Sequence, residues 1–423
     1  MAMQATAAFD VPCAEGAVGV QRRGTGLHTV LALAPPPAGP VVHDGVPAGP
    51  GLPLSVLTGW LRRPAAAGSA VSVITCARRW GGAGPVIPAY RELLGPLTVT
   101  GQRAVYLLLR TEAGLDRDAA AAVRRCRSAT RLLTGLLGEA GVAARPLTAA
   151  QVGELSRTVG LAFGRVALET GPAAPVRPLA LGVADPSGAL EAVWAAGPGG
   201  TTALTISGGP DRVRLHACAR SAAHAYSTGA RLPDGAAPPA PAPESVATES
   251  AVLDGAVLDA AVLDTGLLPI GGAGPLVGAD GGGRPVTLPL SGPEVPRSWL
   301  LGDEVLARRI AVRLAALGIA VCVHTDSPQH WAGLLAAAGR PDLLRFADSG
   351  PAQVVLHEGA APPPQAPGAT VLRLLPADAD APPPADPALI QTGPGAAIAA
   401  GAGRSLPLRL VRGPAEDRLL ADR

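Results

Sequence analysis

Val71-Ser72-Val73-Ile74-Thr75 opens the stretch that decides the fold, residues 70–162. Its β-branched side chains favour a strand, and a second strand is expected at Gln102-Arg103-Ala104-Val105-Tyr106-Leu107-Leu108-Leu109-Arg110. A long helix, a short strand at residues 142–147 and another helix follow along the chain. This order of strands and helices indicates an α/β layer with a partly parallel sheet.

The long helix, expected over residues 115–140, has one apolar face, and arginines fill the opposite face. Gly141 is a suitable residue for the end of this helix. Thr148, followed three residues later by Gln151, predicts a capping box at the start of the next helix. The residues of the apolar face are spaced by three and four positions in turn: Val123, Cys126, Thr130, Leu133 and Leu137.

The segments before this stretch favour a hairpin and a short helix. Residues 16–21 and 27–33 are expected to pair as antiparallel strands, because the glycines between them suit a tight turn. Residues 54–62 have the spacing of a short helix. Trp60 and Trp80 flank the first strand of the central stretch, and we expect both to be core residues.

The second half of the chain predicts more strands and a second subdomain. Strands are expected at residues 201–207 and 213–219 and a strand–helix–strand unit at residues 297–326, whereas the Pro-rich residues 360–387 are expected to be loose. The fold class is therefore α/β, with mixed sheet layers flanked by helices. We expect a core domain over residues 1–228, a Pro/Ala-rich linker over residues 229–250 and a second subdomain over residues 251–423.

Composition excludes several classes of function. The chain has no lysine, which removes Schiff-base catalysis by lysine and the lysine of a phosphate-binding loop. The net charge is only +2, and the richest arginine cluster lies on the outer face of the long helix, so nucleic-acid binding is not expected. That cluster consists of Arg124, Arg125, Arg127 and Arg131.

The cysteines and the apolar runs indicate the cellular compartment of the chain. Five dispersed cysteines suit free thiols in a reducing compartment better than a disulfide framework. No signal peptide is recognisable, and the longest apolar run, residues 314–323, is about half the length that crosses a bilayer.

The strand–helix–strand unit offers a candidate nucleotide-binding site at Gly302 and Asp326. Gly302 lies at the turn between the strand and the helix, and Asp326 follows the second strand, where a ribose-binding acid would lie. The fingerprint of three glycines is missing, and Asp303 and Glu304 would place negative charge where a phosphate binds. We therefore expect these two acids to cap the helix, and we predict no cofactor.

Two groups of histidines raise the question of a metal site. His324, Asp326 and His330 lie within seven residues, and His357 follows at some distance. A metal site needs three or four ligands that converge, so we interpret these residues as polar loop residues and predict no metal. His216, Cys218 and His224 are interpreted in the same way. The sequence contains no catalytic serine elbow and no H-E-x-x-H motif, so no catalytic residue is predicted.

Several of these segments together resemble the soluble domain of the EccE family, a component of the actinobacterial type VII secretion membrane complex. The resemblance is good over residues 9–165 and weaker, but in the same order, to about residue 335. The segments that carry it are Phe9-Asp10-Val11-Pro12, Gly16-Ala17-Val18-Gly19-Val20, Val71-Ser72-Val73-Ile74, Tyr90-Arg91-Glu92-Leu93-Leu94-Gly95-Pro96, residues 102–110, Ala143-Ala144-Arg145-Pro146-Leu147-Thr148 and Gly278-Ala279-Asp280-Gly281-Gly282-Gly283-Arg284-Pro285-Val286.

The resemblance implies a non-catalytic scaffold subunit that contacts the ATPase subunit EccC and the membrane subunits EccB and EccD. EccE proteins usually carry two transmembrane helices before this domain, and this sequence starts where they would end. The expected location is the cytoplasmic face of the cell membrane, or the cytoplasm if the chain acts alone. Two alternatives stay open: an enzyme that binds a nucleotide or nucleotide sugar at Gly302, and a degenerate EccE-like protein without a secretion partner.

Overall fold

The structure, a computed structural model, describes most of the chain. The described residues are 8–13, 16–23, 25–35, 39–43, 51–81, 84–97, 99–112, 118–159, 177–178, 199–208, 212–221, 256–259, 263, 266–347, 351–359 and 367–421. They form a mixed α/β fold in which large sheets are flanked by helices, as the sequence predicts. Within these ranges no helix is both long enough and apolar enough to cross a bilayer.

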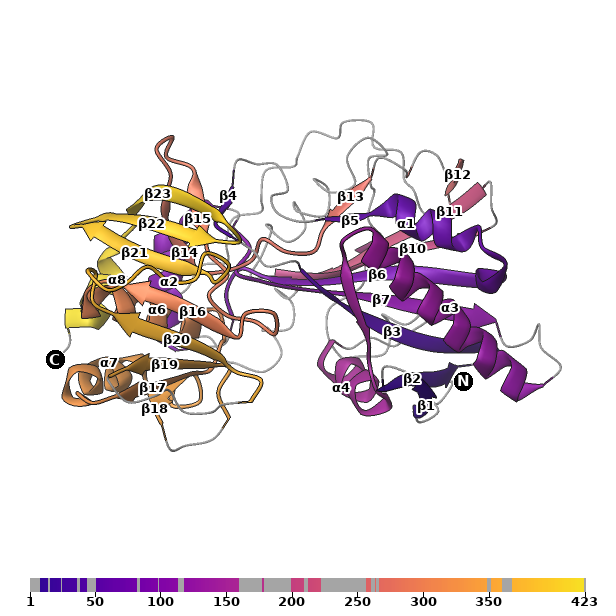
Figure 1. The fold of residues 1–423 in the computed structure, drawn as a ribbon, viewed down its shortest axis with the longest axis horizontal. Helices are drawn as coiled ribbons and strands as arrows, with labels where there is room; N and C mark the ends of the chain where they lie inside the picture. Colours follow the sequence, from indigo (N-terminus) through magenta and orange to yellow (C-terminus); the bar gives the residue numbers. More distant parts are fainter. Residues whose placement is uncertain are drawn as a thin grey trace. The chain divides into compact units, whose positions relative to one another are not determined.

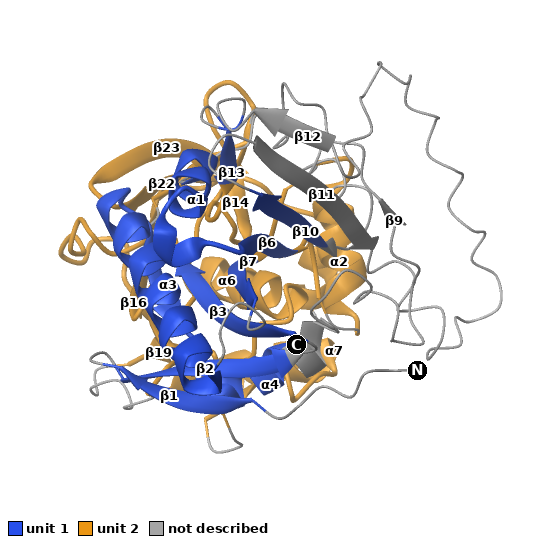
Figure 2. Cartoon of the chain, turned by 90° about the vertical axis from the view of Figure 1, so that its right-hand side faces the viewer, with its two compact units in different colours: residues 1–34, 51–76, 104–268 blue, residues 35–50, 77–103, 269–423 orange. Residues whose placement is uncertain are grey.

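The chain divides into two compact units, and each is built from three separate segments (Figure 2). Unit 1 contains residues 1–34, 51–76 and 104–268, and unit 2 contains residues 35–50, 77–103 and 269–423. The expected domains were continuous, with residues 1–228 in the first and residues 251–423 in the second. The structure corrects this division, because residues 77–103 belong to unit 2 and residues 251–268 to unit 1. The expected linker, residues 229–250, lies outside the described residues.

Unit 1 is organised around one large sheet. The hairpin predicted near the N-terminus is confirmed, since β2 (Gly16–Arg23) and β3 (Gly26–Ala34) pair antiparallel. Strand β3 also pairs antiparallel with β7 (Gln102–Glu112) and β8 (Ala143–Pro146). The order across the sheet is β1 (Phe9–Cys13), β2 (Gly16–Arg23), β3 (Gly26–Ala34), β7 (Gln102–Glu112), β6 (Ser69–Arg78), β10 (Gly199–Gly208), β11 (Arg212–Ser221) and β12 (Ala256–Asp259). Further strands are β8 (Ala143–Pro146), β9 (Arg177–Pro178) and a small pair, β5 (Gly51–Pro53) with β13 (Leu267–Pro269).

Helices cover both faces of this sheet. Helix α3 (Ala119–Glu139) begins at Asp118, whose side chain accepts a hydrogen bond from the Ala120 amide, and it packs against β3 and α1 (Leu54–Leu61). Helix α4 (Ala149–Val159) packs on the opposite face, against a cluster that includes Val30 and Leu108. The predicted apolar face of α3 is confirmed except at Val123, which is half-buried. Its buried residues are Ala122, Cys126, Ala129, Thr130, Leu133 and Leu137.

Unit 2 contains a sheet with a parallel half and an antiparallel half (Figure 1). The parallel half has the order β18 (Leu344–Phe346), β17 (Val321–Thr325), β19 (Val354–Glu358), β20 (Thr370–Leu375), β16 (Arg297–Leu301) and β21 (Ala388–Gly393). The antiparallel half continues with β22 (Ala396–Gly401), β23 (Arg404–Leu410), β14 (Leu276–Ala279), β15 (Pro285–Thr287) and β4 (Val41–Val42).

The expected strand–helix–strand unit at residues 297–326 is present but wider than a simple crossover. The helix, α6 (Glu304–Ala316), connects β16 to β17, and β20 and β19 lie between these two strands. The expectation of a loose tail over residues 360–387 is wrong at β20, which is a central strand of the sheet. Thr370–Leu375 is a short run between Pro-rich segments, and its pairing with β19 and β16 makes it a strand.

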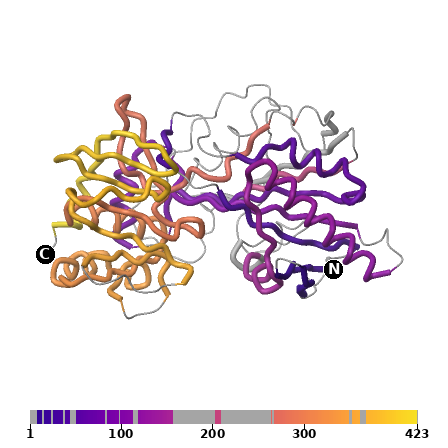
Figure 3. Tube along the Cα trace, in the orientation of Figure 1, coloured from indigo at the N-terminus to yellow at the C-terminus, as the bar shows by residue number. Residues whose placement is uncertain are grey.

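Four helices pack on one face of this sheet: α2 (Val86–Leu94), α6, α7 (Gln329–Ala338) and α8 (Pro414–Ala421). Figure 3 shows the purple segment that contains α2 within the orange and yellow trace of unit 2. Tyr90 of α2 is 2% exposed, and its hydroxyl oxygen accepts a hydrogen bond from the Leu276 amide at 3.1 Å. Helix α2, which lies between β6 and β7 in the sequence, is therefore part of the core of unit 2.

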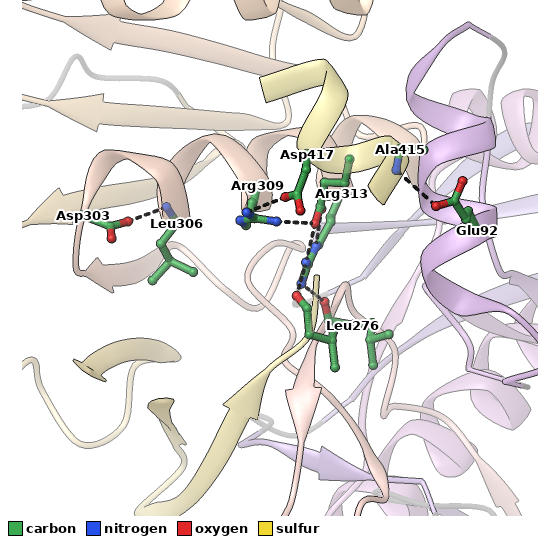
Figure 4. A network of polar contacts seen from close by, with 10 residues as sticks. Glu92, Leu276, Asp303, Leu306, Arg309, Arg313, Ala415 and Asp417 are labelled. Carbon is green, nitrogen blue, oxygen red and sulfur yellow. Dashed lines mark hydrogen bonds and ion pairs between the residues drawn. The ribbon is translucent and has the colours of Figure 1, made fainter. Parts of the chain in front are cut away.

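A buried ion pair joins α6 to α8. Arg313 and Glu416 are 2% and 1% exposed, and two hydrogen bonds of 2.7 and 2.8 Å connect the guanidinium to the carboxylate. The same guanidinium donates to the carbonyls of Leu276 and Val411 (Figure 4). Every charged atom of the pair thus has a partner, which is the condition for burying an ion pair at low cost.

Candidate functional site

The turn at Gly302 is tightly packed by protein atoms. A Cβ at position 302 would lie 2.6 Å from the Gln391 side-chain oxygen and 3.0 Å from the Leu306 side chain. The Gly302 amide donates to the Leu375 carbonyl at 3.0 Å. Close packing therefore explains the glycine, and a phosphate would have to displace Gln391 to reach it.

The side chains of Asp303 and Gln391 cap the start of α6. The Asp303 carboxylate accepts a hydrogen bond from the Leu306 amide at 2.8 Å (Figure 4). The Gln391 side-chain oxygen accepts from the Asp303 amide, and the Gln391 side-chain nitrogen donates to the Asp303 carboxylate. Glu304 adds a second acid to the first turn. The predicted capping role is confirmed, and the geometry gives no support to a nucleotide at this turn.

Asp326 lies at a different place on the same edge of the sheet. It directly follows β17, while Gly302 follows β16, and the two strands are separated by β19 and β20. With strands about 4.8 Å apart, roughly 14 Å separates the two positions across the sheet. The structure does not bring the two predicted site residues together.

The sheet changes direction between β17 and β19. From the carboxyl end of β17 the chain runs through α7 to β18, on one side, whereas from β19 it continues to β20, on the other side. Because these neighbouring parallel strands send their connections in opposite directions, a crevice is expected at their carboxyl ends, where open α/β sheets bind ligands. Asp326 lies at this point.

A row of nitrogen-bearing side chains crosses the sheet beside this point. His324 on β17, His357 on β19 and Arg373 on β20 occupy matching positions in the register, and Trp299 on β16 extends the row. The two imidazole rings are stacked, with centroids 5.2 Å apart and an interplanar angle of 18°. The Arg373 guanidinium carbon lies 5.5 Å from the centre of the Trp299 ring.

Strand alternation explains why these side chains share a face. Their neighbours Val323, Leu356 and Leu372 belong to the hydrophobic core under the helices. Successive side chains of a strand point to opposite faces, so His324, His357 and Arg373 point away from that core.

His357 is buried at the centre of the row, His324 and Arg373 are half-buried, and several of their nitrogen atoms have no protein acceptor within the described part of the chain. His357 is 1% exposed. Among the described residues, His357 Nε2, His324 Nδ1 and Arg373 Nε are buried and have no hydrogen-bond partner. Buried polar atoms are nearly always paired, so three unpaired nitrogens in one row indicate that the row has another role than packing.

Burial, more than neighbouring charge, disfavours protonation of the His357 ring, so its pKa is lowered. Burial lowers the pKa of His357 below its usual value, and His324 and Arg373 lower this pKa further, whereas Asp326 raises it. The Arg373 guanidinium beside the ring is a positive charge that would stabilise a negative group at this place.

The two acids at this edge lie differently. Glu358 is held by the Thr325 hydroxyl at 2.7 Å and by the Trp331 indole nitrogen at 2.9 Å. Asp326 is exposed and lies against Gly359, whose φ of +143° favours glycine. A Cβ at position 359 would lie 2.5 Å from an Asp326 carboxylate oxygen, so Gly359 leaves room for that carboxylate.

The described residues offer no metal site. No group of three or more His, Cys, Asp or Glu side chains within these ranges is arranged to hold a metal ion. His330 Nδ1 lies 3.1 Å from a Glu304 carboxylate oxygen and is exposed, away from the row. The side chains of His216 and Cys218 and all of His224 lie outside the described part of the chain.

A second surface feature of unit 2 is an open pocket of about 500 Å³. The guanidinium carbons of Arg79 and Arg91 lie 4.9 and 5.4 Å from the centre of the Trp80 ring. Trp60 is fully buried, as expected, but Trp80 is only half-buried and lines this pocket. The pocket residues are Arg79, Trp80, Pro88, Arg91, Glu92 and Gly95.

Sequence analysis grouped His324 with His357 but interpreted both as polar loop residues, whereas they lie in strands β17 and β19. His324 and His357 each lie next to the last position of a strand, which was a usable signal, but only the register adds Arg373 to them. No known protein family matches this chain, and no curated protein matches it either.

Proposed function

We propose that this chain is a non-catalytic scaffold component of a type VII secretion membrane complex, with the described fold at the cytoplasmic face of the membrane. The observation that supports the proposal is the resemblance of residues 9–165 to the soluble domain of EccE. Its partners would be the other core subunits, EccB, EccC and EccD. No catalytic residue is assigned.

The residues that carry the resemblance have structural positions, as a scaffold requires. Val71, Val73 and Ile74 are buried in β6, and Tyr90 and Leu94 are buried in α2. A family signal made of core residues is consistent with a function of holding shape and presenting surfaces.

The surface that we assign to subunit contact is the pocket around Trp80. Arg91 and Glu92 belong to the resembling stretch, but their side chains are exposed and line this pocket. Tryptophan and arginine are enriched at the centres of protein interfaces. We expect a partner segment that places a carboxylate between Arg79 and Arg91.

Co-purification from the native host tests the proposal. A tagged full-length chain should be recovered from the membrane fraction together with EccB, EccC or EccD. Trp80→Ala and Arg91→Glu should reduce this recovery at least several-fold, whereas Arg131→Glu, at an exposed position of α3, should not. Recovery of the wild-type chain alone would contradict the proposal.

The two alternatives have their own tests. A degenerate EccE-like protein would be encoded away from genes for other secretion subunits. An enzyme with a nucleotide at Gly302 would bind nucleotides saturably and lose this binding in Gly302→Val. The packing of Gln391 against the turn leaves no room for a nucleotide there, so we expect no such binding.

A further inference from the structure

Beyond the scaffold role, we propose that the row His324–His357–Arg373 binds the phosphate group of a small phosphorylated molecule at the carboxyl edge of the parallel sheet of unit 2. Neither the resemblance to EccE nor the predicted site at Gly302 assigns this function. The site and the scaffold role can fail independently.

Topology brings the three side chains to one point. They come from three neighbouring parallel strands at matching register positions, so their Cα atoms are about 5 Å apart in succession. The point lies beside the change of direction between β17 and β19, where the connections diverge. One tetrahedral group can therefore reach donors from all three strands.

The unpaired atoms match a phosphate in number and kind. His357 Nε2, His324 Nδ1 and Arg373 Nε are buried without an acceptor among the described residues. Imidazole and guanidinium nitrogens donate to phosphate oxygens, and charge-assisted bonds of this kind are stronger than neutral ones. A phosphate would supply the acceptors that these nitrogens lack.

The surrounding charges favour an anion over a metal ion. His324 and Arg373 both oppose protonation of His357, and the Arg373 guanidinium would repel a cation. Asp326 is the acid that acts in the opposite direction, and it lies at the exposed end of the row. We expect the negative charge of Asp326 to weaken phosphate binding moderately. Removal of this charge should therefore increase the affinity for phosphate, which is a second test of the proposal.

Burial of His357 favours a small ligand over a lipid headgroup. Only 1% of this residue is exposed, so a phosphate that is held at a bilayer surface does not reach it. Vesicles of phosphatidic acid and phosphatidylcholine should therefore not bind the chain through Arg373.

The test is calorimetric titration of the full chain with inorganic phosphate at pH 7. The wild-type chain should bind phosphate at one site. His357→Gln and Arg373→Gln should weaken binding at least tenfold, and Asp326→Asn should tighten it several-fold. Arg409→Gln is the matched control, because Arg409 is an exposed arginine of the same sheet on β23, and it should leave the affinity unchanged.

A second measurement keeps the result independent of folding defects in the His357 variant. The chain has seven histidines, so imidazole ¹⁵N resonances can be assigned by single substitutions. Phosphate should shift the resonances of His324 and His357. The proposal is overturned if the wild-type chain binds no phosphate up to about 10 mM, if Arg409→Gln loses as much affinity as Arg373→Gln, if other histidines shift instead, or if vesicle binding depends on Arg373.

Discussion

Single residues in unit 2 show how a charge can be buried without loss of stability. Arg313 directs its guanidinium to a carboxylate and two carbonyls, and Glu416 also accepts a hydrogen bond from Arg309 at 3.1 Å. The desolvation of two buried charges is offset only while all these partners are present. The pair therefore stabilises the fold as a complete set and destabilises it when one member is removed.

Glu416→Gln should destabilise the protein by about 3–5 kcal/mol, because it leaves Arg313 as a buried charge without its counter-ion. Asp417→Asn is the matched control. Asp417 is the next residue of α8, it pairs with Arg309, and half of its side chain is exposed, so its loss should cost at most about 1 kcal/mol. Urea unfolding measures both variants, and equal effects would contradict the prediction.

Tyr90 should make the fold sensitive to alkali. Burial raises the pKa of Tyr90 to about 12, so the folded state favours the neutral phenol. The resulting stabilisation, about 3 kcal/mol for two pKa units, is fully present below pH 10 and is lost as the pH rises toward about 12. Unfolding experiments between pH 9 and about 12.5 measure this loss.

Tyr90→Phe should remove this alkaline loss of stability, although at neutral pH it costs about 1–2 kcal/mol because the Leu276 amide loses its acceptor. Tyr106→Phe is the comparison, since Tyr106 lies in unit 1 and burial raises its pKa as well. A titration followed by phenolate absorbance should show a last transition near pH 12, from Tyr90. This transition should be present in Tyr106→Phe and absent in Tyr90→Phe.

At the residue scale, local motifs were predictable and cross-strand neighbours were not. The capping box is confirmed: the Thr148 amide donates to Gln151 at 3.0 Å, and the Gln151 amide donates to Thr148 at 3.4 Å. Both partners lie within one helical turn. The His324–Arg373 row depends on the alignment of separate strands, with His324 and His357 33 positions apart and His357 and Arg373 16 positions apart, and no local pattern encodes that alignment.

Helices and strands differ in how well their sequences identify them. Helix α3 has a complete apolar stripe, so its location and its buried face follow from periodicity. Strand β20 has only six residues between Pro-rich segments, and its neighbours in the sheet decide its structure. Elements with their own periodicity could be predicted, and short strands that depend on distant partners could not.

The stripe of α3 gives a prediction at the scale of the element. Leu133→Ala should cost about 2–5 kcal/mol, because Leu133 is fully buried against the sheet of unit 1. Leu136→Ala, one turn away on the partly exposed side, should cost clearly less. Thermal unfolding of the two variants compares them, and a larger loss for Leu136→Ala would show that the stripe is misassigned.

The whole molecule is interleaved in a way that composition cannot show. Unit 2 takes residues 77–103 from between two strands of unit 1, because the apolar face of α2 completes its core. The periodicity of a helix predicts that one of its faces is buried, but it does not predict which sheet that face packs against. The sequence therefore predicted the α/β class and most elements, and it failed at the division into domains.

Residues 251–423 expressed alone should not fold, since they lack α2, whose apolar face completes the core of unit 2. A matched chain that joins residues 77–103 to residues 269–423 through a flexible Gly/Ser linker should regain folded structure. Near-UV circular dichroism and urea unfolding distinguish the two chains. A cooperative transition in residues 251–423 alone would mean that α2 is dispensable.

Interleaving also sets the timing of folding during synthesis. The Ala415 amide donates to the Glu92 carboxylate, and the two residues are 323 positions apart. At about 5–20 residues per second, a ribosome needs roughly 15 seconds to one minute to make the intervening chain. Throughout that interval α2 lacks α8, one of the helices that pack against it. We expect the nascent chain to require chaperone protection, and messages truncated before the codons of α8 to yield protein that is degraded.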